Sequence, residues 1–435
     1  MTAATRTVQT AAVALAAEQA ARRLALPEPA PGDQRWPAQS LFKGAAGIAL
    51  LHIERAHAGL ASWQTAHTWI TSAASEAIST AADSGLHFGA TALSFTLHAA
   101  HTDGTARYAT ALATLDRHVS TLTHRRLDDA EARIGRGDLP AFAEYDLLHG
   151  LTGIGAHLLR NAPGSDTLGR VLHYLVRLTA PLRVDGETLP GWWVYHDPQR
   201  SHSAGFPGGH GNLGIAHGIT GPLALLAHAM RRGIVVDDHG EAIAAIYTWL
   251  DTWRDDTGAA PTWPQWITRA ELHTGRLSHP SQLRPSWCYG TPGIARAQQL
   301  AALATADTAR QDIAEHALAH CLADPAQLAR ITDTSLCHGW AGLHQTAWRA
   351  AREARTPAIA DALPHLTDLL VRHGRPGHAD GTGLLEGDAG LALALHTAAH
   401  PATEPISGWD ACLLINTPIF SGEEDAPHAR PHRTA

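Results

Sequence analysis

The chain has 435 residues, of which 45% are hydrophobic and 17% are charged, and its formal net charge is −8. This composition excludes an intrinsically disordered chain, and the length fits about three ordinary domains or one large domain built from repeats. The excess of acidic residues argues against nucleic acid as a partner, and no stretch approaches the roughly 20 apolar residues of a membrane span.

The cysteine content predicts a protein of a reducing compartment. Only four cysteines occur, at positions 288, 321, 337 and 412, which is too few for a disulfide framework in a chain of this length. The apolar stretch Ala11–Ala17 is short and is followed directly by Glu18, unlike the apolar core of a signal peptide. We therefore expect a cytoplasmic protein, and peripheral attachment to a membrane-associated complex stays open.

A Gly-x-x-Gly motif followed by an apolar run recurs along the chain and predicts a repeat architecture. The full copies are KGAAGIALL (43–51), HGLTGIGAHLL (149–159), HGITGPLALL (217–226), YGTPGIARA (289–297), HGWAGLHQTA (338–347) and EGDAGLALAL (386–395). A degenerate copy, FGATALSFTL (88–97), has Ala92 in place of the second glycine. Each copy is expected to begin a short helix that is buried on most sides.

The segments between these motifs mix apolar and polar residues at helical spacing, which predicts longer amphipathic helices. In chain order these are Ala3–Leu24, Ser62–Thr80, Arg107–His124, Ser165–Leu182, Glu241–Arg254, Ala306–Asp324 and a segment after Thr356. We interpret the resulting fourteen helices as an all-α fold, an α/α toroid of seven inner and seven outer helices. We expect one domain over residues 1–416, with short strands and loops in insertions near 183–210 and 255–286, and a disordered tail at 417–435.

Aligning the repeats on their first glycine places two cysteines in one register. Cys288 and Cys337 each lie two residues before that glycine, in consecutive repeats, and His338 follows Cys337 directly. Equivalent positions of a closed ring point to the same end, so these three side chains should meet at one mouth. Two thiolates and an imidazole are the ligands of a zinc site that keeps its fourth position open.

The motifs YDLLHGLTGIG (145–155), NLGIAHGITG (212–221), RPSWCYGTPG (284–293) and CHGWAGL (337–343) resemble those of the lanthionine synthetase C-like family, which includes the class I lanthipeptide cyclases. The resemblance covers nearly the whole chain and implies a seven-fold α/α toroid with one zinc per chain. It implies zinc ligands at Cys288, Cys337 and His338. The catalytic residues that it implies are Asp146, His217, Arg284 and Tyr289. His149 shares the register of His217 but matches no catalytic position of the family.

The reaction that the resemblance implies is the addition of a peptide cysteine thiol to dehydroalanine or dehydrobutyrine, which forms the thioether ring of lanthionine or methyllanthionine. In such a reaction Arg284 would stabilise the enolate that forms after attack, and His217 would act as general acid or general base, oriented by Asp146. The implied partners are a dehydrated precursor peptide with its leader and core, and a complex with a lanthipeptide dehydratase and an exporter.

Other functions stay open at this point. A non-catalytic scaffold that binds peptides within a modification complex is one alternative, and a family member that adds glutathione to dehydrated peptides is another. An α/α-barrel glycosidase or a zinc-dependent prenyltransferase fits less well, because the chain has seven repeats and a thiolate ligand set. The aromatic segments Gly191–His196 and Pro261–Ile267 fit either lids over the core or a surface that holds a peptide.

Overall fold

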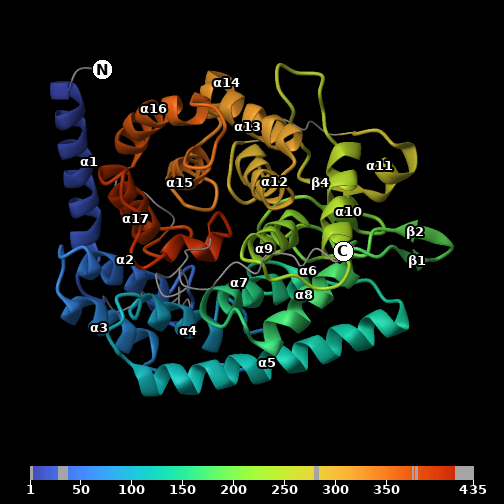
Figure 1. Ribbon diagram of the computed structural model, residues 1–435, viewed down its shortest axis with the longest axis horizontal. Coiled ribbons are helices and arrows are strands. Elements are labelled where there is room, and N and C mark those ends of the chain that lie inside the picture. Colours follow the sequence, from blue (N-terminus) through green and yellow to red (C-terminus); the bar gives the residue numbers. More distant parts are fainter. Residues whose placement is uncertain (1–2, 28–37, 279–283, 375–376, 378–380, 417–435) are drawn as a thin grey trace, which may run out of the picture.

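Seven helices form a closed inner ring in the computed structural model, which describes residues 3–27, 38–278, 284–374, 377 and 381–416 (Figure 1). The ring consists of α2 (Ala45–His57), α4 (Ala90–Ala99), α7 (Leu151–Asn161), α9 (Thr220–Arg231), α12 (Thr291–Thr305), α15 (Trp340–Ala351) and α17 (Asp388–Ala399). Each helix packs against the next one, and α17 packs against α2. The contact between the first and the last repeat closes the ring.

Seven longer helices cover the ring from outside. They are α1 (Ala3–Arg23), α3 (Trp63–Ala73), α5 (Ala109–Arg136), α8 (Asp166–Leu178), α10 (His239–Thr252), α13 (Thr308–Ala323) and α16 (Ala358–His373). Helix α1 packs on α17, and each of the others packs on the inner helix that precedes or follows it in the chain. The predicted seven inner and seven outer helices are therefore all present in the described part of the chain. The short helices α6 (Phe142–Tyr145), α11 (Arg269–Thr274) and α14 (Pro325–Leu328) and the 3-10 helix η1 (Trp409–Leu413) were not predicted.

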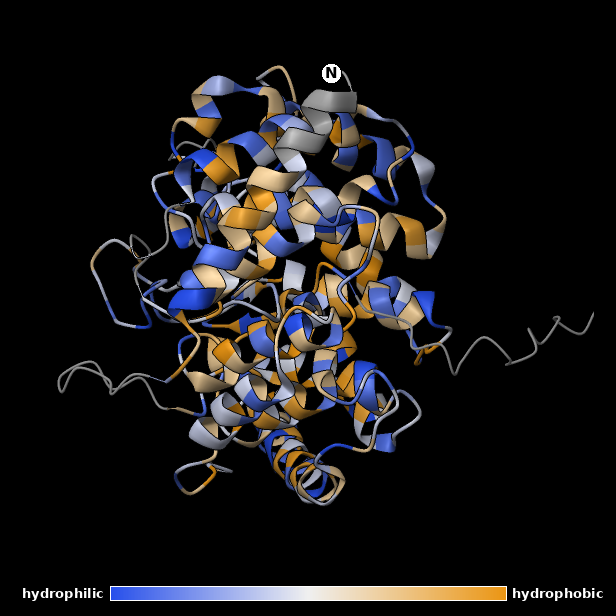
Figure 2. Cartoon of the chain, turned by 90° about the vertical axis from the view of Figure 1, so that its left-hand side faces the viewer, coloured by the Kyte–Doolittle hydropathy of each residue, from blue (hydrophilic) through white to orange (hydrophobic). Residues whose placement is uncertain are grey.

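The two layers differ in burial as their sequences require. All twelve residues of α17 are buried, whereas α8 buries residues such as Leu168, Val171, Leu172 and Leu175 along one face. Figure 2 shows hydrophobic residues concentrated inside the body and hydrophilic residues frequent towards its rim. No helix among the described residues is long and apolar enough to cross a membrane.

Helix α5 is longer than predicted. It continues beyond His124 to Arg136 and ends where Gly137 adopts a left-handed conformation, with φ of 75°. The extra turns bury Leu127 and Ala130 against the rest of the fold. Tertiary packing thus extends a helix whose apolar pattern weakens towards its end.

The second glycine of the motif is needed for close approach of the backbone. A Cβ atom on Gly293 would lie 1.9 Å from the carbonyl oxygen of Trp287, and one on Gly342 would lie 2.0 Å from that of Leu336. A side chain of any size is excluded at these distances. Each loop is therefore folded tightly onto the first turn of the inner helix that follows it, which holds the residues before the first glycine in place.

Backbone hydrogen bonds join the seven loops that precede the inner helices into a circle. The N–H to carbonyl distances are 2.8 Å for Leu41 to His87, 3.1 Å for His87 to Leu148, 3.1 Å for Leu147 to Ala216, 3.3 Å for Ala216 to Cys288, 3.2 Å for Cys288 to Cys337, 3.0 Å for Cys337 to Leu385 and 2.9 Å for Leu385 to Phe42. All seven inner helices therefore begin at the same mouth of the ring. Both cysteines of the predicted zinc site are members of this circle.

The two insertions pair with each other. Strands β1 (Leu182–Val184) and β2 (Glu187–Leu189) form a hairpin, and β3 (His210–Asn212) pairs antiparallel with β4 (Trp266–Thr268). Trp192 is only 3% exposed, and its ring lies 5.8 Å from that of Trp249, so this part of the first insertion is a lid over the core.

Residues 279–283 of the second insertion and the predicted tail at 417–435 lie outside the described residues. The closed ring supports our proposal of a single domain over residues 1–416.

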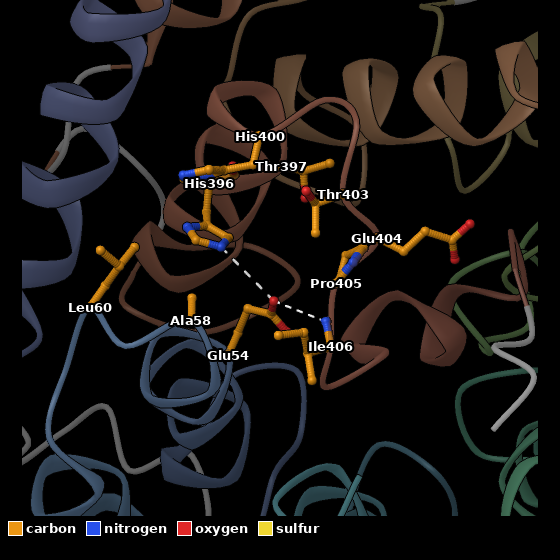
Figure 3. Close-up of a pocket in the computed structure, with 10 residues that line it drawn as sticks. All are labelled: Glu54, Ala58, Leu60, His396, Thr397, His400, Thr403, Glu404, Pro405 and Ile406. Carbon is orange, nitrogen blue, oxygen red and sulfur yellow. Dashed lines mark hydrogen bonds and ion pairs between the residues drawn. The ribbon is translucent and has the colours of Figure 1, made fainter. Parts of the chain in front are cut away.

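The segment after α17 closes the other end of the ring. The carboxylate of Glu54, at the end of α2, accepts hydrogen bonds from the backbone N–H groups of Ile406 (3.1 Å) and Ser407 (2.8 Å). Figure 3 shows Glu54 between this segment and His396 of α17, in a surface pocket. Asp410 is buried and pairs with Arg349 of α15 at 2.6 Å. This end is covered by the chain itself, whereas His217, Cys337 and His338 at the other mouth are partly exposed, and we call that mouth the open one.

Candidate active site

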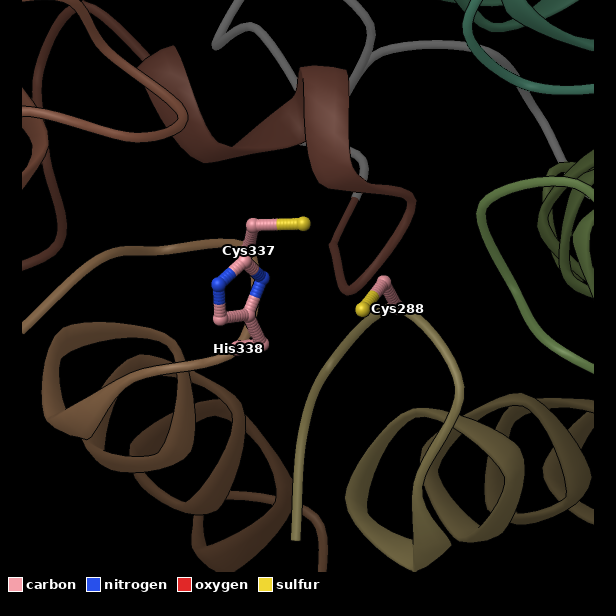
Figure 4. Close-up of side chains that lie close together, drawn as sticks. All are labelled: Cys288, Cys337 and His338. Carbon is pink, nitrogen blue, oxygen red and sulfur yellow. The ribbon is translucent and has the colours of Figure 1, made fainter. Parts of the chain in front are cut away.

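The three predicted zinc ligands meet at the mouth where the inner helices begin. One ligand atom from each of Cys288, Cys337 and His338 lies within 4.8 Å of the other two. Figure 4 shows that the side chains come from two neighbouring loops, the one before α12 and the one before α15. Cys288 is 5% exposed, and the other two residues are half-buried. The site therefore lies at the surface of the mouth, within reach of a ligand from solvent.

The surroundings of Cys288 favour loss of its proton, whereas the hydrogen bond to Cys288 and burial raise the pKa of Cys337. The neighbouring thiol of Cys337 donates a hydrogen bond to Cys288 and, with a further hydrogen bond from His338, lowers the pKa of Cys288 to about 5 although burial opposes this. Burial has the opposite effect at Cys321, where it raises the pKa of the thiol, together with the nearby charge of Asp324, to about 12. A thiolate thus forms more readily at Cys288 than at Cys321. This agrees with a ligand role for Cys288 and a packing role for Cys321.

Asp333 joins the site, and we did not predict it. Its Oδ2 lies 3.3 Å from Nε2 of His338 and 3.3 Å from a terminal nitrogen of Arg284. A carboxylate at one ring nitrogen orients the imidazole and leaves Nδ1 available to a metal. A sequence signal for Asp333 existed, because it precedes Cys337 by four residues just as Arg284 precedes Cys288.

Asp146 and His217 form a hydrogen-bonded pair on the same mouth. The Nδ1–H of His217 donates to Oδ2 of the Asp146 carboxylate over 2.6 Å. The other oxygen, Oδ1, accepts from the backbone N–H groups of His149 (2.6 Å) and Gly150 (2.8 Å). Burial alone would raise the pKa of Asp146, but the hydrogen bonds from His217 and His149 outweigh it and lower this pKa below its usual value. The carboxylate is therefore charged, and it both binds the loop that leads into α7 and orients the imidazole of His217.

The circle of backbone hydrogen bonds brings this pair next to the cysteines. Ala216, directly before His217, donates to the carbonyl oxygen of Cys288. The ring of Tyr289 lies 6.0 Å from that of His217, and its hydroxyl bonds to the side chain of Asn212. Burial and the nearby charge of Cys288 raise the pKa of Tyr289 far above its usual value, so the phenol stays protonated and can donate a hydrogen bond.

His149 lies beside the pair of Asp146 and His217, but its imidazole does not take part in the hydrogen bond between them. Its ring stacks on that of His217 with 6.5 Å between the ring centres, and it contacts the ring of His87 at 3.7 Å. Burial lowers the pKa of His149 to about 3, so its imidazole is neutral near pH 7. The clear contribution of this residue is its backbone N–H, which binds Asp146.

The donor set at the mouth fits a zinc ion. Two sulfur atoms and one imidazole nitrogen are the ligands that zinc prefers, and three protein ligands leave one position for another molecule. The backbone bond from Cys288 to Cys337 (3.2 Å) holds the two loops in register, so the donors are brought together by the fold itself. All seven residues of the predicted site, four catalytic and three metal-ligating, lie in loops at this mouth.

Comparisons with known proteins give one consistent result. Residues 35–414 match the sequence model of the family described as lanthionine synthetase C-like protein. The chain is 25% identical over 288 residues to the nisin biosynthesis protein NisC of Lactococcus lactis subsp. lactis, an alignment that spans 64% of this chain and 66% of that relative, just under two thirds. The solved structure of a nisin cyclase superposes with a TM-score of 0.74 at 21% identity, covering 93% of this chain and 96% of the other.

These findings confirm the α/α toroid fold predicted from the sequence, and they agree with the predicted class of lanthionine-forming enzymes. The family match extends over nearly the whole ring, from the segment before α2 to η1. The chain belongs to the lanthionine synthetase C-like family.

Proposed function

We propose that this chain is a zinc-dependent lanthipeptide cyclase. It would catalyse the Michael-type addition of cysteine thiols in a peptide to dehydroalanine or dehydrobutyrine of the same peptide, forming lanthionine or methyllanthionine rings. The observation that carries this proposal is the meeting of two thiols, an imidazole and an aspartate–histidine pair at the one open mouth of the ring. A family match and a relative named as a nisin biosynthesis protein support the same reaction.

In this proposal Cys288, Cys337 and His338 hold the zinc. When bound, zinc supplies positive charge that lowers the pKa of a substrate thiol from its usual value near 8.5. Asp333 keeps the imidazole of His338 in the orientation that ligation needs.

His217 moves the proton. In the addition, the thiol loses its proton, a bond forms between sulfur and Cβ of the dehydrated residue, and Cα gains a proton, so the proton count balances. The Nδ1 of His217 is held by Asp146, which leaves Nε2 as the nitrogen that faces the substrate. Delivery of the proton to Cα and removal of the proton from the thiol both use this nitrogen.

Arg284 and Tyr289 act on the carbonyl group next to the dehydrated residue. Attack at Cβ places negative charge on that carbonyl oxygen, and donors aimed at developing charge lower the barrier. Only one nitrogen of the Arg284 guanidinium lies at Asp333, and the side chain is 37% exposed, so further N–H donors can reach a peptide. The protonated phenol of Tyr289 is a second donor beside His217.

The proposal includes the expected partners and location. The substrate is a dehydrated precursor peptide with its leader and core, processed together with a lanthipeptide dehydratase and an exporter. We propose a cytoplasmic location because the thiols at the mouth are free and need reducing conditions to bind a metal.

The test is ring formation by a His217→Ala variant. We expect this variant to keep its fold and zinc while forming thioether rings about 10²–10⁴-fold more slowly, because general acid–base catalysis contributes that much. The readout is the loss of alkylatable thiols from a dehydrated precursor, followed by mass spectrometry. His173→Ala, at an exposed position of α8, is the control variant.

Two outcomes would contradict the proposal. A wild-type rate in His217→Ala would remove the catalytic role of that residue. Absence of ring formation by the wild type, with retained binding of the dehydrated peptide, would favour the scaffold. A precursor with blocked cysteines, incubated with glutathione, separates ring formation from glutathione addition, because only the second reaction adds the mass of glutathione.

A further inference from the structure

A second group of metal-ligating side chains lies between α4, α5 and α7. One ligand atom from each of His98, Asp116 and His157 lies within 4.8 Å of the other two, and the described residues contain one other such group, the one at the open mouth. His98 lies in the last turn of α4 and His157 in the second half of α7. The group is therefore near the end of the ring opposite to the cysteines.

Short polar contacts connect these side chains. The Nε2 of His98 lies 3.1 and 3.2 Å from the two carboxylate oxygens of Asp116. The hydroxyl of Ser94 donates to Asp116 over 2.7 Å and lies 3.1 Å from Nε2 of His157. The Nδ1 of His157 lies 3.1 Å from the side-chain amide of Asn161. Three helices thus direct two imidazoles and one carboxylate to a single point.

This arrangement differs from that of several other buried histidines of the fold. His52, His228 and His239 each pair with a backbone carbonyl oxygen, at 2.6, 3.1 and 2.9 Å. His157 is equally buried, yet its Nε2 faces side chains that carry ligand atoms. A buried histidine whose only purpose is to hydrogen-bond a backbone carbonyl does not need a second histidine and an aspartate beside it.

The repeats show that packing does not require an imidazole here. Counted from the first glycine of each motif, His157 occupies the seventh position. The other repeats have Leu51, Thr96, Leu225, Ala297, Thr346 and Ala394 at that position. A ring of this geometry is therefore built with small or apolar residues at the same place, and the polar cluster needs another explanation.

The protonation states suit a cation. Burial lowers the pKa of His157 to about 3, so its imidazole is neutral and able to bind a metal near pH 7. Burial raises the pKa of Asp116, but hydrogen bonds from His98 and Ser94 outweigh it and lower this pKa, so the carboxylate is charged. The carboxyl ends of α4 and α7 add partial negative charge at the same place.

We propose that His98, Asp116 and His157 form a second zinc site, which fastens the outer helix α5 to the inner helices α4 and α7. Two imidazoles and a carboxylate are an established type of zinc ligand set, and the fourth position can take water or the hydroxyl of Ser94. The side chains of His98 and Asp116 are 20% and 44% exposed, so an ion can enter from solvent. The amide nitrogen of Asn161 lies 3.1 Å from Nδ1 of His157 and donates to the carbonyl oxygen of His157. Binding through Nε2 places the proton of His157 on Nδ1, so the Asn161 amide must turn until its oxygen accepts that proton.

The test is the zinc stoichiometry of the full chain. Protein stripped with a chelator is saturated with Zn²⁺, dialysed, and measured by elemental analysis. We expect two equivalents for the wild type and one for Asp116→Asn and for His98→Ala. His118→Ala, which removes an exposed imidazole from the same helix α5, should keep two. A wild type that saturates at one equivalent, or equal losses in all three variants, would overturn the proposal.

A second measurement does not depend on these variants folding. In Cys337→Ala, which lacks a ligand of the first site, zinc addition should slow amide hydrogen exchange in the first half of α5 and at the end of α4, and should leave α13 unchanged. Unchanged exchange in α5 would overturn the second site. Because neither readout uses ring formation, a failure here is distinct from a failure of the proposed cyclase activity.

Discussion

The two oxygens of the Asp146 carboxylate serve different purposes, and two substitutions can separate them. Oδ1 accepts the backbone N–H groups of His149 and Gly150 in the loop before α7, and Oδ2 holds Nδ1 of His217. Asp146→Asn keeps an oxygen for these N–H groups and replaces the second oxygen by an amide. Because that amide donates, Nδ1 of His217 must accept, and the imidazole is forced into the other tautomer. Asp146→Ala removes both functions.

The structure sets the size of each effect. Loss of a hydrogen bond to a charged group costs about 1.5–3 kcal/mol of unfolding free energy, which both variants should show. Loss of the acceptor for the backbone N–H groups of His149 and Gly150 adds about 1–3 kcal/mol in Asp146→Ala alone. Both variants should form rings about 10²–10⁴-fold more slowly, because Asp146→Asn holds His217 in the wrong tautomer and Asp146→Ala leaves it without an orienting partner. Denaturant unfolding and the thiol-alkylation assay measure the two quantities.

The pH dependence has a defined sign. The pKa of Asp146 is lowered in the folded chain, so its contribution to stability is present above the unfolded value of about 3.9. It is lost as the pH falls through the lower folded value. The stability difference between wild type and Asp146→Asn should therefore be constant from neutral pH to about pH 5 and shrink below about pH 4. Wild-type ring formation by Asp146→Asn, or equal stability of the two variants, would refute this reasoning.

Three further predictions concern the metal, the repeat glycines and the closed end of the ring. Cys337→Ala should lose one equivalent of zinc by elemental analysis and keep its helical circular dichroism; full zinc retention would remove the ligand assignment. Gly293→Ala should lose about 1–3 kcal/mol or more of unfolding free energy from backbone overlap, whereas Gly169→Ala, with open space around it in α8, should lose none. Asp410→Asn removes the buried charged partner of Arg349, which keeps only the half-exposed Glu404, and should cost about 3–5 kcal/mol in denaturant unfolding while zinc content stays unchanged.

The sequence alone determined the repeat, the toroid and the register of the two cysteines proposed to bind zinc. This was possible because the information is local: a glycine that must approach a carbonyl six residues earlier marks the start of six of the seven inner helices, as at Gly293. Once the glycines are aligned, Cys288 and Cys337 fall at one position without any knowledge of distances. Proximity of neighbouring repeats then follows from closure of the ring.

Tertiary structure decided what depends on contacts between distant segments. Asp333 is tied to His338 and Arg284 by side-chain geometry, and no spacing rule states that one carboxylate oxygen meets both. The different partners of the two Asp146 oxygens also depend on contacts between distant segments. The same holds for the packing of η1 at the far end of the ring. The cluster of His98, Asp116 and His157 joins three helices, and its residues resemble ordinary surface or core positions in the sequence. Local pattern specifies where helices begin, but only the closed ring specifies which of their side chains meet.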